Sequence, residues 1–324
     1  MAELTMAQAL NRALGDALAE DDRVLILGED VGKLGGVFRI TDGLQDRFGT
    51  SRVFDTPLAE SAIAGVSVGL SQAGWKPVCE MQFEAFSYPA LDEVISHIAK
   101  YRYRSKGTTQ VPMVMRIPYG GGIGAAEHHS ESPETYYAHT AGLKVVVPST
   151  PLDAYTLLRR AIDDPDPVIF FEPKSRYWSK EPGEPQMEGP GIGEARVARE
   201  GSHATLIAWG AMVTRCLEAA AAAGEDGVEV EVLDLRSLVP LDLHALATSV
   251  QKTGRAVVVH EAPMTAGFGA EVVSRIVEDS FDHLEAPPLR VTGYDTPYPP
   301  ATLEEHYLPS VDRILLALEK VLTH

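Results

Sequence analysis

Short runs rich in β-branched residues alternate with helix-like segments throughout the first half of the chain, and this alternation constrains the fold most strongly. Predicted strands lie at residues 24–27, 52–54, 77–81, 113–117, 144–147 and 168–171. Strands that alternate with helices are typical of a mostly parallel sheet covered by helices on both faces. The carboxyl ends of such strands gather at one edge of the sheet, so we expect functional groups in the loops that follow them.

Helices are predicted between these strands. The clearest spans residues 89–104, where Leu91, Val94 and Ile98 recur at helical spacing and Pro89 suits the first turn. Another helix is expected at residues 6–19. Residues 61–75 are uncharged and rich in small side chains, but they fall short of the about 20 residues that a membrane span needs. We therefore expect a core helix there.

The alternation lapses at residues 177–190, a stretch with three prolines and two glycines that reads as a linker. Further strands are then predicted at residues 205–209, 228–233, 256–260 and 289–291. Further helices are predicted at residues 213–223, 243–252, 269–278 and 311–322. Because a chain of 324 residues suits two domains, we predict an α/β protein with one domain at residues 1–188 and a smaller α/β domain at residues 189–324.

Acidic residues outnumber basic residues by 46 to 28. This excess argues against binding to nucleic acid or to an anionic membrane surface, because both present negative charge. The first residues show neither a basic region nor an apolar run of the signal-peptide type. Cys79 and Cys216 lie in apolar contexts far apart in the sequence, as expected for buried reduced thiols. We therefore expect a cytoplasmic protein without a nucleic-acid or membrane partner.

Glu60 is the first conspicuous candidate for chemistry. It follows the strand at residues 52–54, and the next charged residue is Lys76. An acid at the start of a helix is stabilised by the helix dipole, so one interpretation of Glu60 is a helix-capping residue. The small residues after it would set the carboxylate against close-packed backbone, where partial burial raises a pKa and permits proton exchange near neutral pH. The local sequence leaves both interpretations open.

A glycine-rich segment at residues 119–126 directly follows another predicted strand and leads to two histidines. Gly120, Gly122 and Ala125 match a G-x-G-x-x-A dinucleotide fingerprint, but no phosphate-binding helix is expected after them. His128, His129 and Glu131 could form part of a metal site, although no spacing such as H-E-x-x-H accompanies them. Two histidines in such a loop also suit proton transfer, and hydrogen-bonded structural residues are the alternative.

The strand at residues 77–81 is followed by Gln82, Phe83 and Phe86. The amide can take part in hydrogen bonds, and the aromatic rings offer a stacking face. Packing in the core is the commoner explanation for aromatic residues at such a position. Contact with a cofactor is the alternative.

Several longer motifs occur in a fixed order along the chain. In the first half they are Gly28-Glu29-Asp30, Thr56-Pro57-Leu58-Ala59-Glu60, Met81-Gln82-Phe83, Ala99-Lys100-Tyr101-Arg102-Tyr103-Arg104 and His128-His129-Ser130-Glu131-Ser132-Pro133-Glu134. Later ones are Ile169-Phe170-Phe171-Glu172-Pro173-Lys174, His260-Glu261-Ala262-Pro263 and Gly293-Tyr294-Asp295-Thr296-Pro297. Over nearly its whole length the chain therefore resembles the beta subunit of the decarboxylating component of a 2-oxo acid dehydrogenase.

The resemblance implies a transketolase-like fold, with a pyrimidine-binding domain, a smaller C-terminal domain, and thiamine diphosphate held between this subunit and an alpha subunit. It implies that Glu60 hydrogen-bonds a pyrimidine nitrogen and thereby activates the cofactor to attack a 2-oxo acid. Leu58, Gln82 and Phe86 match positions that line the pyrimidine, although relatives often have tyrosine in place of Phe86. His129 matches a loop histidine that handles protons or orients the lipoyl group during acyl transfer.

The sequence contains no Gly-Asp-Gly, the motif with which thiamine diphosphate enzymes usually hold magnesium and diphosphate. By resemblance, an alpha subunit therefore supplies the Mg²⁺ site, within a heterotetramer of two alpha and two beta subunits. The second domain, with the helix at residues 314–322, is expected to form the dimer contact and to dock the lipoyl-bearing acyltransferase. The family also often binds a structural potassium ion, near the positions that match Val111, Met113, Val114, Ala161, Asp164 and Asp166.

The motifs at residues 260–263 and 293–297 look closer to the branched-chain type of this family than to its other types. The resemblance therefore favours a branched-chain 2-oxo acid such as 3-methyl-2-oxobutanoate, and a pyruvate or acetoin dehydrogenase subunit is the alternative. A non-catalytic or dinucleotide-binding subunit is the distant alternative, because a doubly wound fold alone would permit it.

Overall fold

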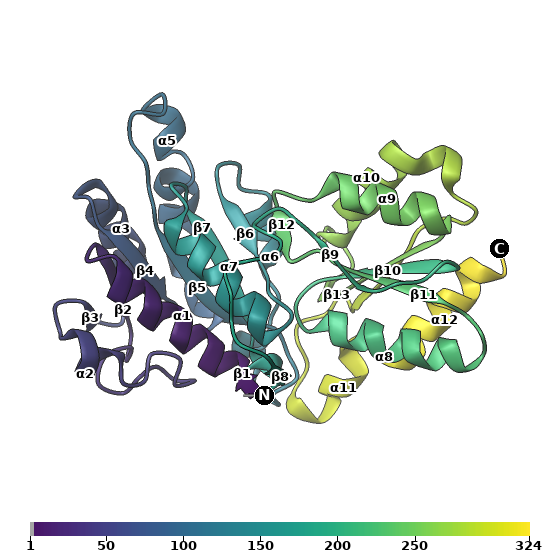
Figure 1. Cartoon of the computed structure of the whole chain (residues 1–324), viewed down its shortest axis with the longest axis horizontal. Helices are drawn as coiled ribbons and strands as arrows, with labels where there is room; N and C mark the ends of the chain where they lie inside the picture. Colours follow the sequence, from purple (N-terminus) through teal and green to yellow (C-terminus); the bar gives the residue numbers. More distant parts are fainter. Residues whose placement is uncertain (1–2) are drawn as a thin grey trace.

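A computed structural model describes residues 3–324 of the chain (Figure 1). Its larger sheet has seven strands in the order β12-β6-β7-β5-β4-β2-β3, and neighbouring strands are parallel except where β12 meets β6. The first half of the chain supplies β2 (Val24–Gly28), β3 (Val53–Asp55), β4 (Lys76–Glu80), β5 (Val114–Tyr119), β6 (Lys144–Val146) and β7 (Val168–Pro173). The predicted parallel sheet is confirmed, and its central strands are buried on both faces, as apolar runs allow.

Helices cover both faces of this sheet. The long helices α1 (Met6–Glu20) and α7 (Pro151–Asp163) lie side by side on one face, and their apolar sides share a core with the strands (Figure 1). The other face is covered by α3 (Glu60–Gln72) and by the segment that follows β4. The core helix predicted at residues 61–75 is therefore present, and Ile63, Ala64 and Val68 belong to the buried apolar cluster. Its outer face, with Ala62, Val66 and Gly69, is exposed.

The predicted regular helix at residues 89–104 is wrong in detail. The segment is divided into η1 (Glu84–Ala90), α4 (Leu91–Glu93), the π-helical η2 (Val94–Ile98) and α5 (Tyr101–Arg104). The widened turn is visible where the Ala99 N–H bonds the Val94 carbonyl at 3.0 Å, five residues back. Gly142 packs so closely here that an added Cβ would lie 1.9 Å from the Ala99 carbonyl oxygen. Apolar spacing alone could not predict this contact.

The smaller sheet has the strand order β14-β13-β10-β11-β9, and only β9 is antiparallel to its neighbour. Its strands are β9 (Arg196–Arg199), β10 (Ala204–Ala208), β11 (Val230–Asp234), β13 (Ala256–Pro263) and β14 (Leu289–Gly293). Its covering helices are α8 (Met212–Glu225), α9 (Leu243–Thr253), α10 (Gly269–Ser280) and α12 (Val311–Leu322). Four strands and all four helices agree with the predicted second domain, so the predicted α/β class with two sheets is confirmed.

The predicted linker is partly ordered. Within it, β8 (Lys180–Pro182) pairs antiparallel with β1 (Glu3–Thr5), and the side chain of Tyr177 is buried. The chain also crosses back, because β12 (Ser237–Val239) from the second half extends the larger sheet beside β6. A three-residue strand whose partner lies far away in the sequence leaves little periodic signal. The division at residues 188 and 189 stays a prediction.

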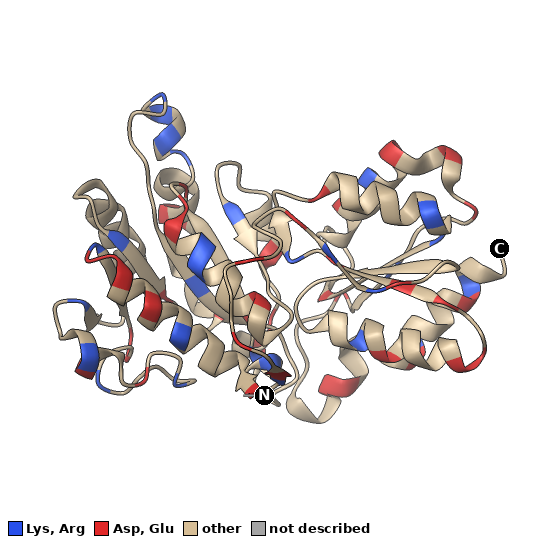
Figure 2. Cartoon of the chain, in the orientation of Figure 1, with Lys and Arg blue, Asp and Glu red and all other residues tan. Residues whose placement is uncertain are grey.

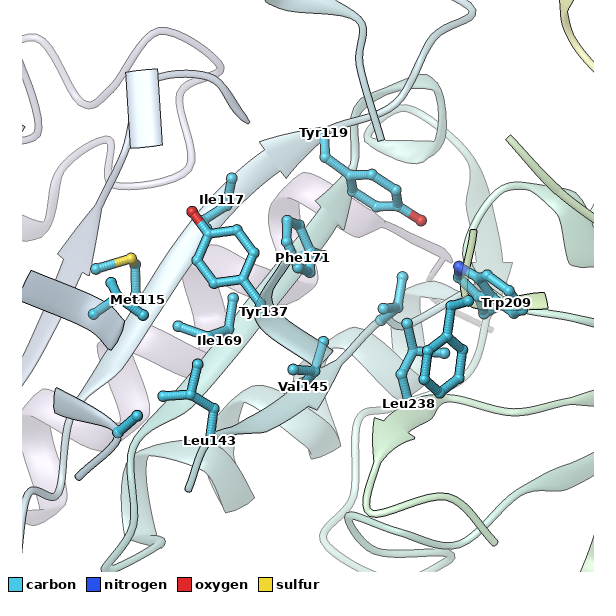
Figure 3. Packing of buried hydrophobic residues seen from close by; sticks show 14 of the residues in the cluster. Met115, Ile117, Tyr119, Tyr137, Leu143, Val145, Ile169, Phe171, Trp209 and Leu238 are labelled. Carbon is cyan, nitrogen blue, oxygen red and sulfur yellow. The ribbon is translucent and has the colours of Figure 1, made fainter. Parts of the chain in front are cut away.

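One buried apolar cluster runs from the larger sheet into the second half of the chain. Ile169 and Phe171 of β7 share it with Trp209 and with Leu238 of β12, as Figure 3 shows. Rigid packing of this kind fixes loops of the second half against the strand ends of the first.

Charged residues are spread over the helices of both halves, and basic residues mark the tip at α5 (Figure 2). No helix within residues 3–324 is long and apolar enough to cross a membrane. Cys79 and Cys216 are both free and buried, which confirms the expectation for these two thiols.

Candidate active site

Glu60 occupies the first position of α3, shortly after the carboxyl end of β3. The Thr56 N–H bonds the Gly28 carbonyl at 2.8 Å, which keeps this loop against the end of β2. The start of α3 has no side-chain cap, so Glu60 is not a hydrogen-bonded capping residue. Its side chain is half-buried, and nearby Leu58 is 80% exposed. This corner of the molecule presents an available carboxylate beside an uncovered apolar side chain.

Glu29 adds a second carboxylate to this corner at the end of β2. Its side chain is 3% exposed, and its Oε1 has no hydrogen-bond partner in the described chain. Burial raises the pKa of Glu29, and the negative charges of Glu60 and Asp30 raise it further. Gln82, just after β4, donates its Nε2 to Asp30 Oδ2 at 3.0 Å. Three strand ends therefore contribute to one acidic cluster with an adjoining amide.

The imidazole of His129 packs edge-on against two aromatic rings. Its ring centroid lies 4.1 Å from that of Phe83 and 5.4 Å from that of Phe86. Burial lowers the pKa of His129, and the neighbouring His128 and the Lys174 ammonium lower it further. This lowering favours the neutral form of the His129 imidazole, which can accept a proton.

A buried ion pair behind His129 was missed by the sequence analysis. Lys174 follows β7, and its Nζ lies 2.5 Å from Glu84 Oε2 with both side chains fully buried. The other oxygen of Glu84 accepts the Glu131 N–H at 2.8 Å, at the end of the histidine-bearing loop. Burial raises the pKa of Glu84 to about 7 and lowers that of Lys174. The position of Lys174 at a strand end is the signal that could have predicted it.

The glycine loop, defined here as residues 120–126, does not have a phosphate-binding arrangement. Its backbone N–H groups donate to carboxylates of the second half, Glu261 and Glu304. Only the short turn η3 (Glu127–His129) follows the loop. The structure therefore argues against a dinucleotide site, because the donors that a diphosphate needs are already used within the chain. Glu131, one of the three residues considered for a metal site, accepts a hydrogen bond from the Tyr88 hydroxyl at 2.5 Å.

The residues matched to a potassium site lie at the opposite edge of the sheet, where β5 and β7 begin. They are Val111, Met113, Val114, Ala161, Asp164 and Asp166. The Lys144 ammonium lies 2.7 and 2.6 Å from the two oxygens of Asp164 and 3.7 Å from Asp166. Asp166 also pairs with Arg102. Basic side chains thus neutralise both carboxylates, so an added cation would depend on backbone carbonyls.

The structure places Glu60, Gln82, Phe86 and His129 at the carboxyl edge of the larger sheet, on the loops and short helical segments that follow its strands. Gln82 and Phe86 link the two parts, because they lie on one segment between the acidic cluster and His129. The site offers a carboxylate, an imidazole and aromatic faces, which suit proton transfer beside a flat ring. The roles of these residues remain predictions.

Two family models match the sequence. The transketolase pyrimidine binding domain matches residues 2–179, and the transketolase C-terminal domain matches residues 193–314. A solved structure titled "Split gene transketolase, inactive beta4 tetramer" superposes with a TM-score of 0.81, covering 99% of this chain and 98% of that one. At 24% sequence identity this likeness concerns the fold alone. Together these matches confirm the transketolase-like fold class.

Curated relatives match almost the full length of the chain. The 3-methyl-2-oxobutanoate dehydrogenase subunit beta of Mycobacterium tuberculosis is 56% identical, over 98% of this chain and 92% of its own. A pyruvate dehydrogenase E1 component subunit beta from Leifsonia xyli is 53% identical, over 99% and 95%. The 2-oxoisovalerate dehydrogenase subunit beta of Pseudomonas aeruginosa is 47% identical, over 98% and 95%.

Proposed function

We propose that this chain, which belongs to the family of 2-oxo acid dehydrogenase beta subunits, acts in the oxidative decarboxylation of a branched-chain 2-oxo acid. The family expected from the motifs is thereby confirmed. Two relatives named for branched-chain substrates, at 56% and 47% identity, support this substrate class. A relative named pyruvate dehydrogenase, at 53% identity, makes pyruvate the second candidate.

The observation that carries the proposal is the partly exposed Glu60 carboxylate on a pyrimidine-binding domain. That domain implies that thiamine diphosphate is involved. The residues present fit the cofactor's pyrimidine, because Glu60 and the unpartnered Glu29 Oε1 offer polar groups beside uncovered Leu58. When bound, thiamine diphosphate supplies the carbon nucleophile and the electron sink for decarboxylation. Glu60 would hold a proton at a pyrimidine nitrogen, while Leu58 and Phe86 pack against the ring.

His129 is assigned to the second half of the reaction, acyl transfer to a lipoyl group. In the overall reaction the bond between the carboxylate and the carbonyl carbon breaks, and its electron pair reduces the lipoyl disulfide. One sulphur bonds the acyl carbon, and the other takes up one proton. The neutral His129 imidazole, held between aromatic rings, would hold or move the proton at that second sulphur.

The beta subunits of this family work with an alpha partner, and we propose that an alpha subunit completes the site in a heterotetramer of two alpha and two beta subunits. The absence of Gly-Asp-Gly in the sequence supports an alpha subunit that binds Mg²⁺ and diphosphate. The exposed, uncharged outer face of α3 and the side chain of Leu58 are surfaces that such a partner would cover. α12 and its domain remain the proposed docking region for the lipoyl-bearing acyltransferase.

Two further expectations stand as proposals. A potassium ion would bind through carbonyl groups where β5 and β7 begin, because Lys144 already neutralises the nearby carboxylates. A cytoplasmic location is supported by the free, buried thiols of Cys79 and Cys216.

The test is turnover by this chain after assembly with its alpha subunit. We expect no decarboxylation by either chain alone, and faster turnover of 3-methyl-2-oxobutanoate than of pyruvate by the pair. Faster pyruvate turnover would overturn the substrate assignment. Thiamine diphosphate and Mg²⁺ should scarcely raise the melting temperature of the lone chain, because their main anchor lies elsewhere. Stabilisation of the lone chain by NAD would instead support a dinucleotide site.

A further inference from the structure

The glycine loop is held at its outer side by two acidic residues of the second half of the chain. Glu304 accepts the Gly122 N–H on Oε1 and the Gly124 N–H on Oε2, each at 2.9 Å. Glu261 accepts the Gly121 N–H on Oε2 at 2.8 Å. Hydrogen bonds from backbone N–H groups to carboxylates are among the stronger ones in proteins. Both carboxylates therefore contribute to holding the loop in one conformation.

Glu304 is itself fixed in place. It begins the short helix α11 (Glu304–Tyr307) and is 7% exposed. The Tyr298 hydroxyl donates to its Oε1 at 2.8 Å, and the Tyr298 ring packs on that of Tyr307 with centroids 4.8 Å apart. Each oxygen of the carboxylate thus has a backbone donor, and one also has a hydroxyl donor.

The loop is shaped to accept this contact. Gly122 and Gly124 have φ angles of +86° and +68°, which favour glycine, and their N–H groups face the same carboxylate. A Cβ on Gly121 would lie 1.8 Å from the Tyr298 hydroxyl oxygen. The glycines therefore let the second half approach the loop backbone directly.

The turn η3, which carries His129, directly follows the glycine loop. The Gly120 N–H bonds the Glu131 carbonyl at 2.9 Å, and Glu84 holds the Glu131 N–H, so the base of the loop is closed. The hydrogen bonds at the base of the loop and the bonds to Glu304 both fix the segment that leads to His129, whose ring centroid lies 4.1 Å from that of Phe83. The position of the imidazole therefore depends on both anchors.

We propose that Glu304 is a positioning residue, whose carboxylate fixes the glycine loop and thereby sets the His129 imidazole for acyl transfer. The role of His129 rests on the proposed function. The C-terminal domain then takes part in the reaction through its hold on this loop. Glu60 lies on α3 and is not bonded to the glycine loop in the described chain, so decarboxylation should depend little on Glu304.

The experiment compares the two half-reactions in the complete complex with the alpha subunit and the acyltransferase. Glu304→Gln keeps the size of the side chain but turns one oxygen into an NH₂ that faces a backbone N–H. Decarboxylation is followed with an artificial electron acceptor, and reductive acylation is followed on the lipoyl domain. Because small misplacements can cost up to about 100-fold, we expect kcat for acylation to fall roughly 10–100-fold. Decarboxylation should change less than about twofold.

Three further variants sharpen the comparison. Glu305→Gln is the matched control, since the neighbouring residue is exposed and the charge change is identical; both half-reactions should be unchanged. Glu304→Asp keeps the charge and should recover part of the acylation rate. Tyr298→Phe removes only the hydroxyl that orients Oε1, and it carries the test if Glu304→Gln does not fold. A selective loss of acylation in Tyr298→Phe supports the proposal, and an unchanged rate overturns it.

Equal losses in both half-reactions of Glu304→Gln would show a merely structural role and overturn the proposal, as would an unchanged acylation rate. His129→Asn separates this inference from the function on which it rests. If His129→Asn leaves acylation intact, the assigned role of His129 fails. If His129→Asn abolishes acylation while Glu304→Gln does not affect it, only the positioning role of Glu304 fails.

Discussion

The two sides of the candidate active site differ in how far the chain completes them by itself. The open side consists of Leu58, Glu60 and the outer face of α3, where apolar surface is uncovered. The closed side consists of the glycine loop with Glu261 and Glu304, where the chain supplies acceptors for backbone donors. The C-terminal domain thus completes one side, and the difference fits the proposal that a cofactor and a partner subunit complete the other.

The largest expected effect comes from Glu60→Gln on the open side. In the assembled enzyme the variant should lose roughly 10²–10⁴-fold in decarboxylation rate, the usual contribution of a group that transfers protons. The melting temperature of the lone chain should stay nearly unchanged, because the start of α3 has no side-chain cap to lose. Steady-state kinetics and thermal melting check the two expectations. Undiminished decarboxylation would remove Glu60 from the mechanism.

A methyl group introduced on the closed side by substitution should lower the stability of the lone chain. Gly121→Ala would place its Cβ 1.8 Å from the Tyr298 hydroxyl oxygen. Because overpacking a fitted contact costs about 1–3 kcal/mol, the free energy of unfolding should fall by that amount in urea titrations of the lone chain. No change in the unfolding midpoint would show that the loop and the Tyr298 segment can move apart at little cost in free energy.

Gly69→Ala is the corresponding change on the open side. Apart from the backbone of its own helix and its chain neighbours, nothing lies within 4 Å of a Cβ added to this helical glycine. The lone chain should therefore become about 0.5–1 kcal/mol more stable, because alanine loses less backbone entropy than glycine in a helix. If the partner covers this face, the same variant should weaken subunit assembly, which analytical ultracentrifugation would measure. Destabilisation of the lone chain would contradict the open-side description.

The closed side also predicts that the free energy of unfolding depends on pH. Glu134 is fully buried, and burial raises its pKa to about 8, with a further increase from the negative charge of Glu261 on the closed side. Trp209 Nε1 donates to Glu134 Oε1 at 3.2 Å. Between the ordinary glutamate pKa and about 8, the folded chain binds more protons than the unfolded chain. The stabilising contribution of this group is therefore present at low pH and is lost as pH rises, by up to about 1.4 kcal/mol per unit.

Glu134→Gln removes that titration. We compare the free energies of unfolding of the variant and of the unsubstituted chain in urea titrations. The variant's value minus that of the unsubstituted chain should be smallest at pH 5 and should rise steadily up to pH 8. A difference that stays constant over this range would show that Glu134 is already ionised in the folded chain.

The smallest effect is expected for Leu58→Ala in the lone chain. A side chain that is 80% exposed contributes little to folding, so the free energy of unfolding should change by less than about 0.5 kcal/mol. In the assembled enzyme the same variant should raise the KM for thiamine diphosphate, because a packing surface for the pyrimidine is lost. An equal KM would remove Leu58 from the cofactor site.

The sequence predicted the strands that carry the site, because apolar runs and helical spacing are local signals. Motif resemblance singled out Glu60, Gln82, Phe86 and His129, and their roles stay predictions. The sequence could not predict the Lys174–Glu84 pair or the Glu304 contact, since these residues meet only after distant segments pack. The π-helical turn at η2 was also missed, because the apolar residues of this segment recur at the spacing of a regular helix.

The crossing strand β12 has a consequence for synthesis. β6 pairs with β7 on one side, and on the other side only Ser237–Val239 covers it. When the first domain has emerged from the ribosome, residues 237–239 have not yet been made. The edge of the sheet at β6 is therefore unpaired during this part of translation. Bare edges recruit other strands, and a protein cut at the linker would keep one permanently. The larger sheet is therefore complete only after the second half of the chain has been made.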